Sequence, residues 1–164
     1  MAKFKIVPLS KAFAKKIRET RQDDFDNEVI EEVATGLGPC RVSLKPFKKG
    51  EDKRLVLSHS PFELKNPFNQ PGPIFISANE VEEYADVYKF PQEIKNNKKS
   101  FLITLIGYNK EQWMIHNHLV SENEDIDEVI SEIFDNFPEV DYLHARSAKA
   151  CCYICKIIRS HPGK

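Results

Sequence analysis

Residues 36–76 limit what this chain can fold into more than any other stretch. They contain six of the ten prolines and four of the six glycines. Because proline lacks a backbone donor and glycine favours turns, a long helix is excluded here. The stretch instead predicts short strands over 41–44, 55–59 and 73–76, with a proline-rich loop over 60–73. Loops of this length are often functional.

N-cap residues, with apolar periodicity in the second and third cases, predict three helices elsewhere. The first follows Ser10 over 11–20, the second begins after Asn79 and ends at Pro91, and the third begins after Asp125 and ends at Pro138. Ser, Asn and Asp are favoured N-cap residues. Further strands are expected over 4–6, 101–106, 112–120, 140–146 and 152–158. We therefore expect an α+β fold, with a mostly antiparallel mixed sheet and about three helices packed on it, in a single domain over residues 1–164.

The overall composition excludes several classes of protein. Hydrophobic residues make up 41% and charged residues 30%, as in ordinary globular proteins. A net charge of -1 gives no field for nucleic acid, and the longest apolar run, 101–108, is too short to cross a membrane. Four cysteines without an export signal are expected to be reduced thiols in a cytoplasm. The acidic residues of 23–32 are expected to form solvated surface.

His116 and His118 are weak candidates for a metal site. Two residues apart on a strand, their imidazoles would share one face, as two ligands of a zinc ion can. A third ligand, His59 or His144, could come only through the fold. The alternative is a solvated pair of histidines. Cys152 and Cys155 have zinc-like spacing, but a strand would put them on opposite faces, so buried thiols are expected.

Cys40 and His144 are the candidates for catalysis. A thiol beside Arg41 could be a nucleophile, with His144 or His59 as its base. The alternative is that Cys40 packs under the sheet. The sequence has no phosphate-binding loop, dinucleotide fingerprint, serine-hydrolase elbow or zinc-protease motif, and we expect no cofactor.

Several short segments resemble one family. GPCRVSL over 38–44, the pair Gly50-Glu51, Pro67-Phe68 and GPIFI over 72–76 are similar to motifs of the bacterial domain-of-unknown-function family 1203. Its members carry PGYPCRVSL, a GE pair, SPY and GPIFV in this order. YLHARSA over 142–148, Cys152-Tyr153 and Arg159 resemble its YIHVHNA, GCY and terminal arginine. The resemblance implies a small bacterial domain of unassigned function, and it supplies no catalytic residue, cofactor or partner.

This chain departs from the family pattern at three positions. Arg146 stands where the pattern has a second histidine or an arginine, Ser147 replaces an asparagine, and Cys151 replaces a glycine. We infer that position 151 does not need a positive φ.

The polar residues of these motifs suggest one hypothesis about function. If the segment carrying Arg41 lies beside the strand carrying His144 and Arg146, the three side chains would line a pocket for a small anionic ligand. A protein partner is the other expectation, and the oligomeric state stays open.

Overall fold

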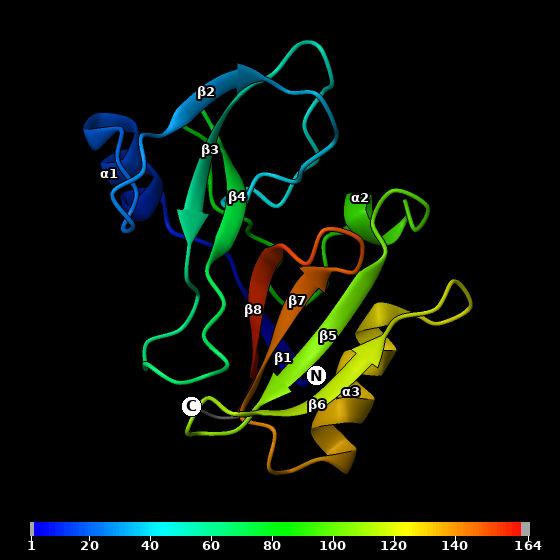
Figure 1. The fold of residues 1–164 in the computed structure, drawn as a ribbon. Coiled ribbons are helices and arrows are strands. Elements are labelled where there is room, and N and C mark those ends of the chain that lie inside the picture. Colours follow the sequence, from blue (N-terminus) through cyan, green and yellow to red (C-terminus); the bar gives the residue numbers. More distant parts are fainter. Residues whose placement is uncertain (1, 162–164) are drawn as a thin grey trace.

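Two antiparallel sheets make up the fold in the computed structural model, which describes residues 2–161. The five-stranded sheet has the order β1-β8-β7-β5-β6, and the three-stranded sheet has the order β2-β3-β4 (Figure 1). The strands are β1 (Phe4–Val7), β2 (Ile30–Val33), β3 (Lys53–His59), β4 (Gly72–Ser77), β5 (Ile103–Tyr108), β6 (Met114–Leu119), β7 (Tyr142–Ser147) and β8 (Tyr153–Arg159). The helices are α1 (Lys11–Thr20), α2 (Gln92–Lys95) and α3 (Ile126–Asn136). The predicted α+β class is confirmed.

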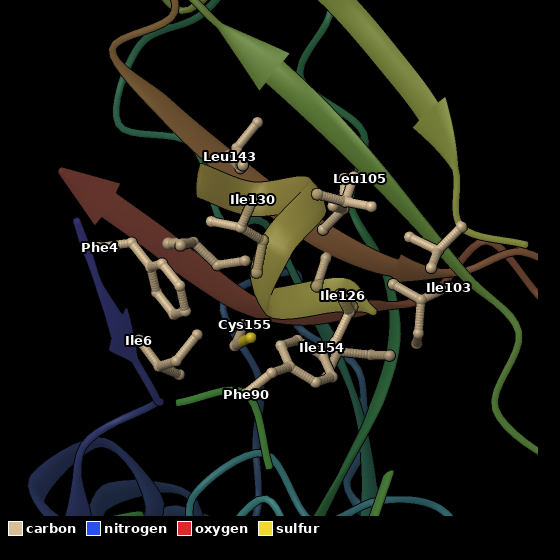
Figure 2. Close-up of a cluster of buried hydrophobic side chains, with 14 of the residues drawn as sticks. Phe4, Ile6, Phe90, Ile103, Leu105, Ile126, Ile130, Leu143, Ile154 and Cys155 are labelled. Carbon is tan, nitrogen blue, oxygen red and sulfur yellow. The ribbon is translucent and has the colours of Figure 1, made fainter. Parts of the chain in front are cut away.

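Helix α3 covers one face of the five-stranded sheet (Figure 2). The Asp125 side chain caps it by accepting from the amides of Asp127 and Glu128, as the sequence predicts. Its apolar stripe, including Ile126 and Ile130, packs on the inward side chains of the sheet. Burial of this stripe is what stabilises a helix of only eleven residues.

The three-stranded sheet and α1 enclose a second core. Ser10 caps α1 by accepting from the Phe13 amide, and Ala14 and Ile17 are the buried face of the helix. These residues pack with the inner side chains of β3 and β4 and with Tyr153 of β8. Because β8 belongs to the other sheet, Tyr153 joins the two halves of the molecule on the face opposite α3.

The helix expected after Asn79 is absent, which corrects that prediction. Residues 79–86 are irregular, and their backbone groups bind other parts of the chain. The Tyr84 amide donates to the Val42 carbonyl at 2.9 Å, and the Val87 carbonyl accepts from Ile6 at 2.7 Å. Tertiary hydrogen bonds have therefore replaced the helical ones. The helix in this region, α2, begins after Pro91, the residue at which the predicted helix was expected to end.

One further prediction was wrong, and another holds except at one residue. Residues 41–44 form a turn rather than a strand, because the Leu44 amide donates back to the Cys40 carbonyl at 2.9 Å and Leu44 has φ +54. The acidic residues of 23–32 lie at the surface as expected, except for Asp23, which is buried, and the stretch also contains the start of edge strand β2. No helix within residues 2–161 combines the length and hydropathy needed to cross a bilayer.

Candidate functional site

Strand β7 directs three polar side chains to the face opposite α3. Its register with β5 is regular, with Tyr142 opposite Tyr108 and His144 opposite Ile106. Alternate residues of a strand share a face. Tyr142, His144 and Arg146 therefore lie together, while Leu143 and Ala145 point into the α3 core. We call these three residues the β7 triplet.

Arg41 lies next to the β7 triplet, through Tyr153. The Arg41 Nε donates to the Tyr153 carbonyl, and its Nη1 donates to the Pro39 carbonyl. The Tyr153 ring packs against His144 with 5.0 Å between ring centroids. The early Pro-Cys-Arg segment and the late His-x-Arg segment are thus neighbours in space. Burial lowers the pKa of Arg41 to about 10, so the guanidinium stays charged at neutral pH.

Most polar atoms of the β7 triplet are buried without a partner. His144 is 0% exposed and Arg146 is 6% exposed. Within the described residues, no hydrogen bond reaches the Tyr142 hydroxyl, either ring nitrogen of His144, or the Nε and Nη2 of Arg146. Arg146 donates through Nη1 to the Cys151 carbonyl at 3.0 Å. Burial raises the pKa of Tyr108, and the nearby Arg146 guanidinium opposes that rise, so the Tyr108 hydroxyl lies close to Arg146. Unpaired buried polar groups are rare because each forfeits its hydration.

Positive charges dominate around His144, whereas the carboxylates of Asp141 and Glu63 act on Tyr142. Burial, together with Arg146, Lys156 and His59, lowers the pKa of His144 to about 2, so its ring is neutral at physiological pH. A histidine with so low a pKa is a poor general base at neutral pH. The Lys156 ammonium lies 4.4 Å from the centroid of the Tyr142 ring. Across residues 2–161, neither Arg41 nor Arg146 forms a salt bridge, whereas the equally buried Arg54 pairs with Glu32 at 2.8 Å.

Aromatic rings that the sequence analysis did not single out surround His144. Phe62, Tyr108, Tyr142 and Tyr153 all have ring centroids within 4.8–5.2 Å of the His144 ring. We call these four rings the aromatic box. The sequence signal that could have found one of these rings is the spacing of Tyr142 two residues before His144, which places both side chains on one face of a strand. Phe62 comes from the loop between β3 and β4, and nothing local in the sequence predicts its position.

Cys40 lies apart from the histidines. Its side chain is buried in the core of the three-stranded sheet and borders a hollow of about 800 Å³, which Glu51 and Lys45 also line. No histidine lines this hollow, and within the described residues the Cys40 thiol has no hydrogen bond to one. No described contact therefore activates Cys40, although catalysis by Cys40 or His144 stays an untested prediction.

His116 and His118 share a face of β6, as predicted, but it is the α3 face. The His118 Nε2 lies 3.0 Å from a carboxylate oxygen of Glu124, and the His116 ring packs against Phe137. His144 is on the opposite face of the sheet, so it cannot join them. The described residues contain no group of three or more potential ligands placed to hold a metal ion.

The C-terminal cysteines correct two further expectations. Cys155 is buried beneath α3 as expected, but Cys152 is half-buried just before β8, so only one of the two is a core thiol. Cys151 has φ +61, although we inferred that this position does not need a positive φ. The tight β7–β8 turn requires that conformation whichever residue occupies it.

Comparison with known proteins supports the family resemblance. The family model described as "Protein of unknown function (DUF1203)" matches residues 38–159, which include Arg41 and the whole β7 triplet. Searches of curated proteins and of solved structures found no match. Since the matched range covers most of the 164 residues, this chain belongs to the DUF1203 family.

Proposed function

We propose that this protein binds a small carboxylate or phosphate anion at the β7 triplet. The observation that carries the proposal is the free edge of Arg146. Its Nε and Nη2 are buried and unpaired, while Nη1 is occupied by a carbonyl. The N–H bonds of Nε and Nη2 point the same way from the planar guanidinium, so they form the fork that a carboxylate or phosphate takes with two parallel hydrogen bonds.

The energetic argument is that a buried charge needs compensation. A guanidinium without a counter-charge in the protein interior costs several kcal/mol. A bound anion would supply that counter-charge and would accept from both free donors. A conformer in which water reaches the site would reduce the same cost, so the experiment must separate an anion from hydration.

The neighbouring residues support a division of roles. The Tyr142 hydroxyl and one nitrogen of His144 are buried donors without acceptors, so each could bind a further oxygen of the anion. Arg41 uses Nε and Nη1 on carbonyls, so we assign it charge and positioning of Tyr153 rather than the main contact. Lys156 adds a second nearby positive charge.

Calorimetric titration and thermal unfolding with acetate, inorganic phosphate and chloride test the proposal. Acetate or phosphate should raise the unfolding temperature of the wild type, because a ligand that binds only the native state stabilises it. Arg146→Met should abolish the effect, and Arg146→Lys should weaken it because an ammonium cannot form the fork. Lys149→Met, which removes an exposed cation from the same turn, is the matched control and should leave the response unchanged.

Two results would overturn the proposal. One is a wild type whose unfolding temperature and titration heat respond to acetate and phosphate no more than to chloride. The other is an anion response that survives in Arg146→Met, which would locate the binding elsewhere.

A protein partner is the second candidate, and edge strand β6 favours it. Trp113, Ile115 and Leu119 are 54%, 40% and 56% exposed on or beside this unpaired edge. An exposed apolar edge strand is a template for pairing with another chain. A second copy would make a continuous sheet, so light scattering should detect a dimer that Leu119→Lys dissolves. A monomer at high concentration would contradict this candidate.

We also propose a bacterial cytoplasm as the place of action. All four cysteines are free thiols, which supports a reducing compartment.

A further inference from the structure

Phe62 is the one ring of the aromatic box that comes from a loop, and the rings beside it hold it as they would hold the ring of a bound ligand. Its ring contacts Tyr108 and His144 edge-on, with centroid distances of 5.1 Å to each. Its side chain is buried, although Glu63 and Leu64 beside it are exposed. Edge-to-face contacts at this distance are the preferred geometry for an aromatic ring held by other rings.

The segment that carries Phe62 is a loop with few ties to the rest of the molecule. It covers residues 60–71 and hangs from the three-stranded sheet beside one end of the five-stranded sheet (Figure 1). Within the described residues it makes no backbone–backbone hydrogen bond outside itself. The Gln112 side chain accepts from the amides of Glu63 and Leu64 at 3.2 and 3.1 Å, and Asn66 donates to the carbonyls of Glu111 and Gln112.

The polar ties are side-chain hydrogen bonds at 3.1–3.3 Å, and the apolar ties are the rings of Phe62 and Phe68, which pack with Tyr108 and Tyr142. Opening the loop therefore exposes two rings but breaks no backbone–backbone hydrogen bond to the rest of the described chain. The rings on β5 and β7 would stay in place, because their strands are held by sheet hydrogen bonds and by the α3 core. Departure of Phe62 would leave an aromatic slot bounded by Tyr108, Tyr142 and His144.

The Cα atom of Arg146 lies one two-residue step along β7 from that of His144, about 6.6 Å at the usual rise of a strand, and the two side chains share one face. A ring seated on His144 and an acidic group on Arg146 are therefore within the reach of one small molecule. Neither feature alone selects a ligand class, but together they select a flat ring that carries a carboxylate.

We propose that the ligand is an aromatic carboxylate whose ring takes the place of Phe62 and whose carboxylate takes the Nε–Nη2 edge of Arg146. This inference rests on the proposed anion site and adds the class of ligand and the route of entry. The loop of residues 60–71 is a lid over this site, and Phe62 occupies the position of the ligand ring when no ligand is bound.

Titration of wild type and Phe62→Ala with benzoate, cyclohexanecarboxylate, benzyl alcohol and acetate tests it. Phe62→Ala should bind benzoate roughly tenfold or more tightly than the wild type does, because the protein's own ring no longer competes for the box. Acetate should bind both proteins alike. Benzyl alcohol lacks the charge and cyclohexanecarboxylate lacks the flat ring, so both should bind Phe62→Ala more weakly than benzoate. Leu64→Ala shortens an exposed apolar side chain of the same loop, keeps Phe62, and should not change benzoate affinity.

The wild type gives a second measurement that needs no variant. Benzoate should speed hydrogen exchange at the amides of Glu63 and Leu64, because these amides lose their hydrogen bonds to the Gln112 side chain when the loop opens. Acetate should leave the exchange of both amides unchanged. If acetate binds but benzoate binds Phe62→Ala no better than acetate does, the aromatic slot is wrong and the anion site stands. If neither binds either protein, both proposals fall. If exchange at these two amides is unchanged with benzoate bound, the proposal that the loop opens to admit the ligand is wrong.

Discussion

Cys151 should limit the stability of this protein through its backbone alone. It sits at φ +61 in the turn between β7 and β8, and its amide donates to the Ser147 carbonyl at 2.8 Å. The left-handed conformation costs an L-residue about 1–2 kcal/mol. Glycine avoids that cost, but it also makes the unfolded chain more flexible, and this offsets about 0.4–1 kcal/mol of the gain in stability. Cys151→Gly should therefore raise the free energy of unfolding by about 0.5–1 kcal/mol.

The expected gain is measurable for a chain of this length. About 1 kcal/mol shifts the melting temperature of a 150–250-residue protein by about 2–4 °C. The assay is urea and thermal unfolding under reducing conditions, so that no thiol is oxidised. Cys151→Ala is the matched control, because it removes the same exposed thiol and keeps the strained φ. A Gly variant no more stable than the Ala variant would refute the reasoning, since the positive φ would then carry no cost.

Three further predictions concern Arg159, His144 and the joining of the two cores. Arg159→Ala should lower the free energy of unfolding by about 2–3 kcal/mol, measured in urea titrations. The reason is that the Arg159 guanidinium donates to the carbonyls of Phe134, Phe137 and Val140 at and just after the end of α3. A loss no larger than that of the exposed variant Lys149→Ala would contradict this. Since the pKa of His144 is lowered to about 2, the unfolded chain binds a proton there below about pH 6.5 and the folded chain does not. Between pH 7 and pH 5, the free energy of unfolding should therefore fall by about 2 kcal/mol more in the wild type than in His144→Phe. Equal falls in the two proteins would show that His144 is not held neutral in the folded state. The chain should unfold in one transition, with Trp113 fluorescence and far-UV circular dichroism coinciding, because Tyr153 and Arg41 join the two cores; separated transitions would indicate two domains.

The elements that could be predicted from the sequence are those with a strong local signal. Helices α1 and α3 each combine an N-cap residue with an apolar stripe, and the structure confirms both. The segment after Asn79 carried the same two signals and is not a helix. Its amides and carbonyls bind Val42 and Ile6, residues distant in sequence, and no local pattern reveals such competition. Strand β2 was hidden for the opposite reason, because its exposed residues show no alternation to detect.

The candidate site divides in the same way. The motif order pointed to Arg41, His144 and Arg146, and period 2 along a strand is enough to place the last two on one face. The sequence could not predict that Arg41 would bind carbonyls, because the positions of Tyr153 and Pro39 beside Arg41 depend on how the two sheets meet. Phe62 was out of reach for a related reason, because the position of a loop ring depends on the sheet beneath it.

The strongest reason to regard the β7 triplet as a binding site is how this fold treats its other arginines. Arg54 has Glu32, Thr35 and the face of Phe75 within contact, and Arg159 has three carbonyls. Of the seven buried side-chain atoms that lack a partner within residues 2–161, five belong to Tyr142, His144 and Arg146. Poor packing or chance would scatter such atoms over the chain. Their concentration on one strand face, around a guanidinium that displays its two-donor edge, is the arrangement that an anion would complete.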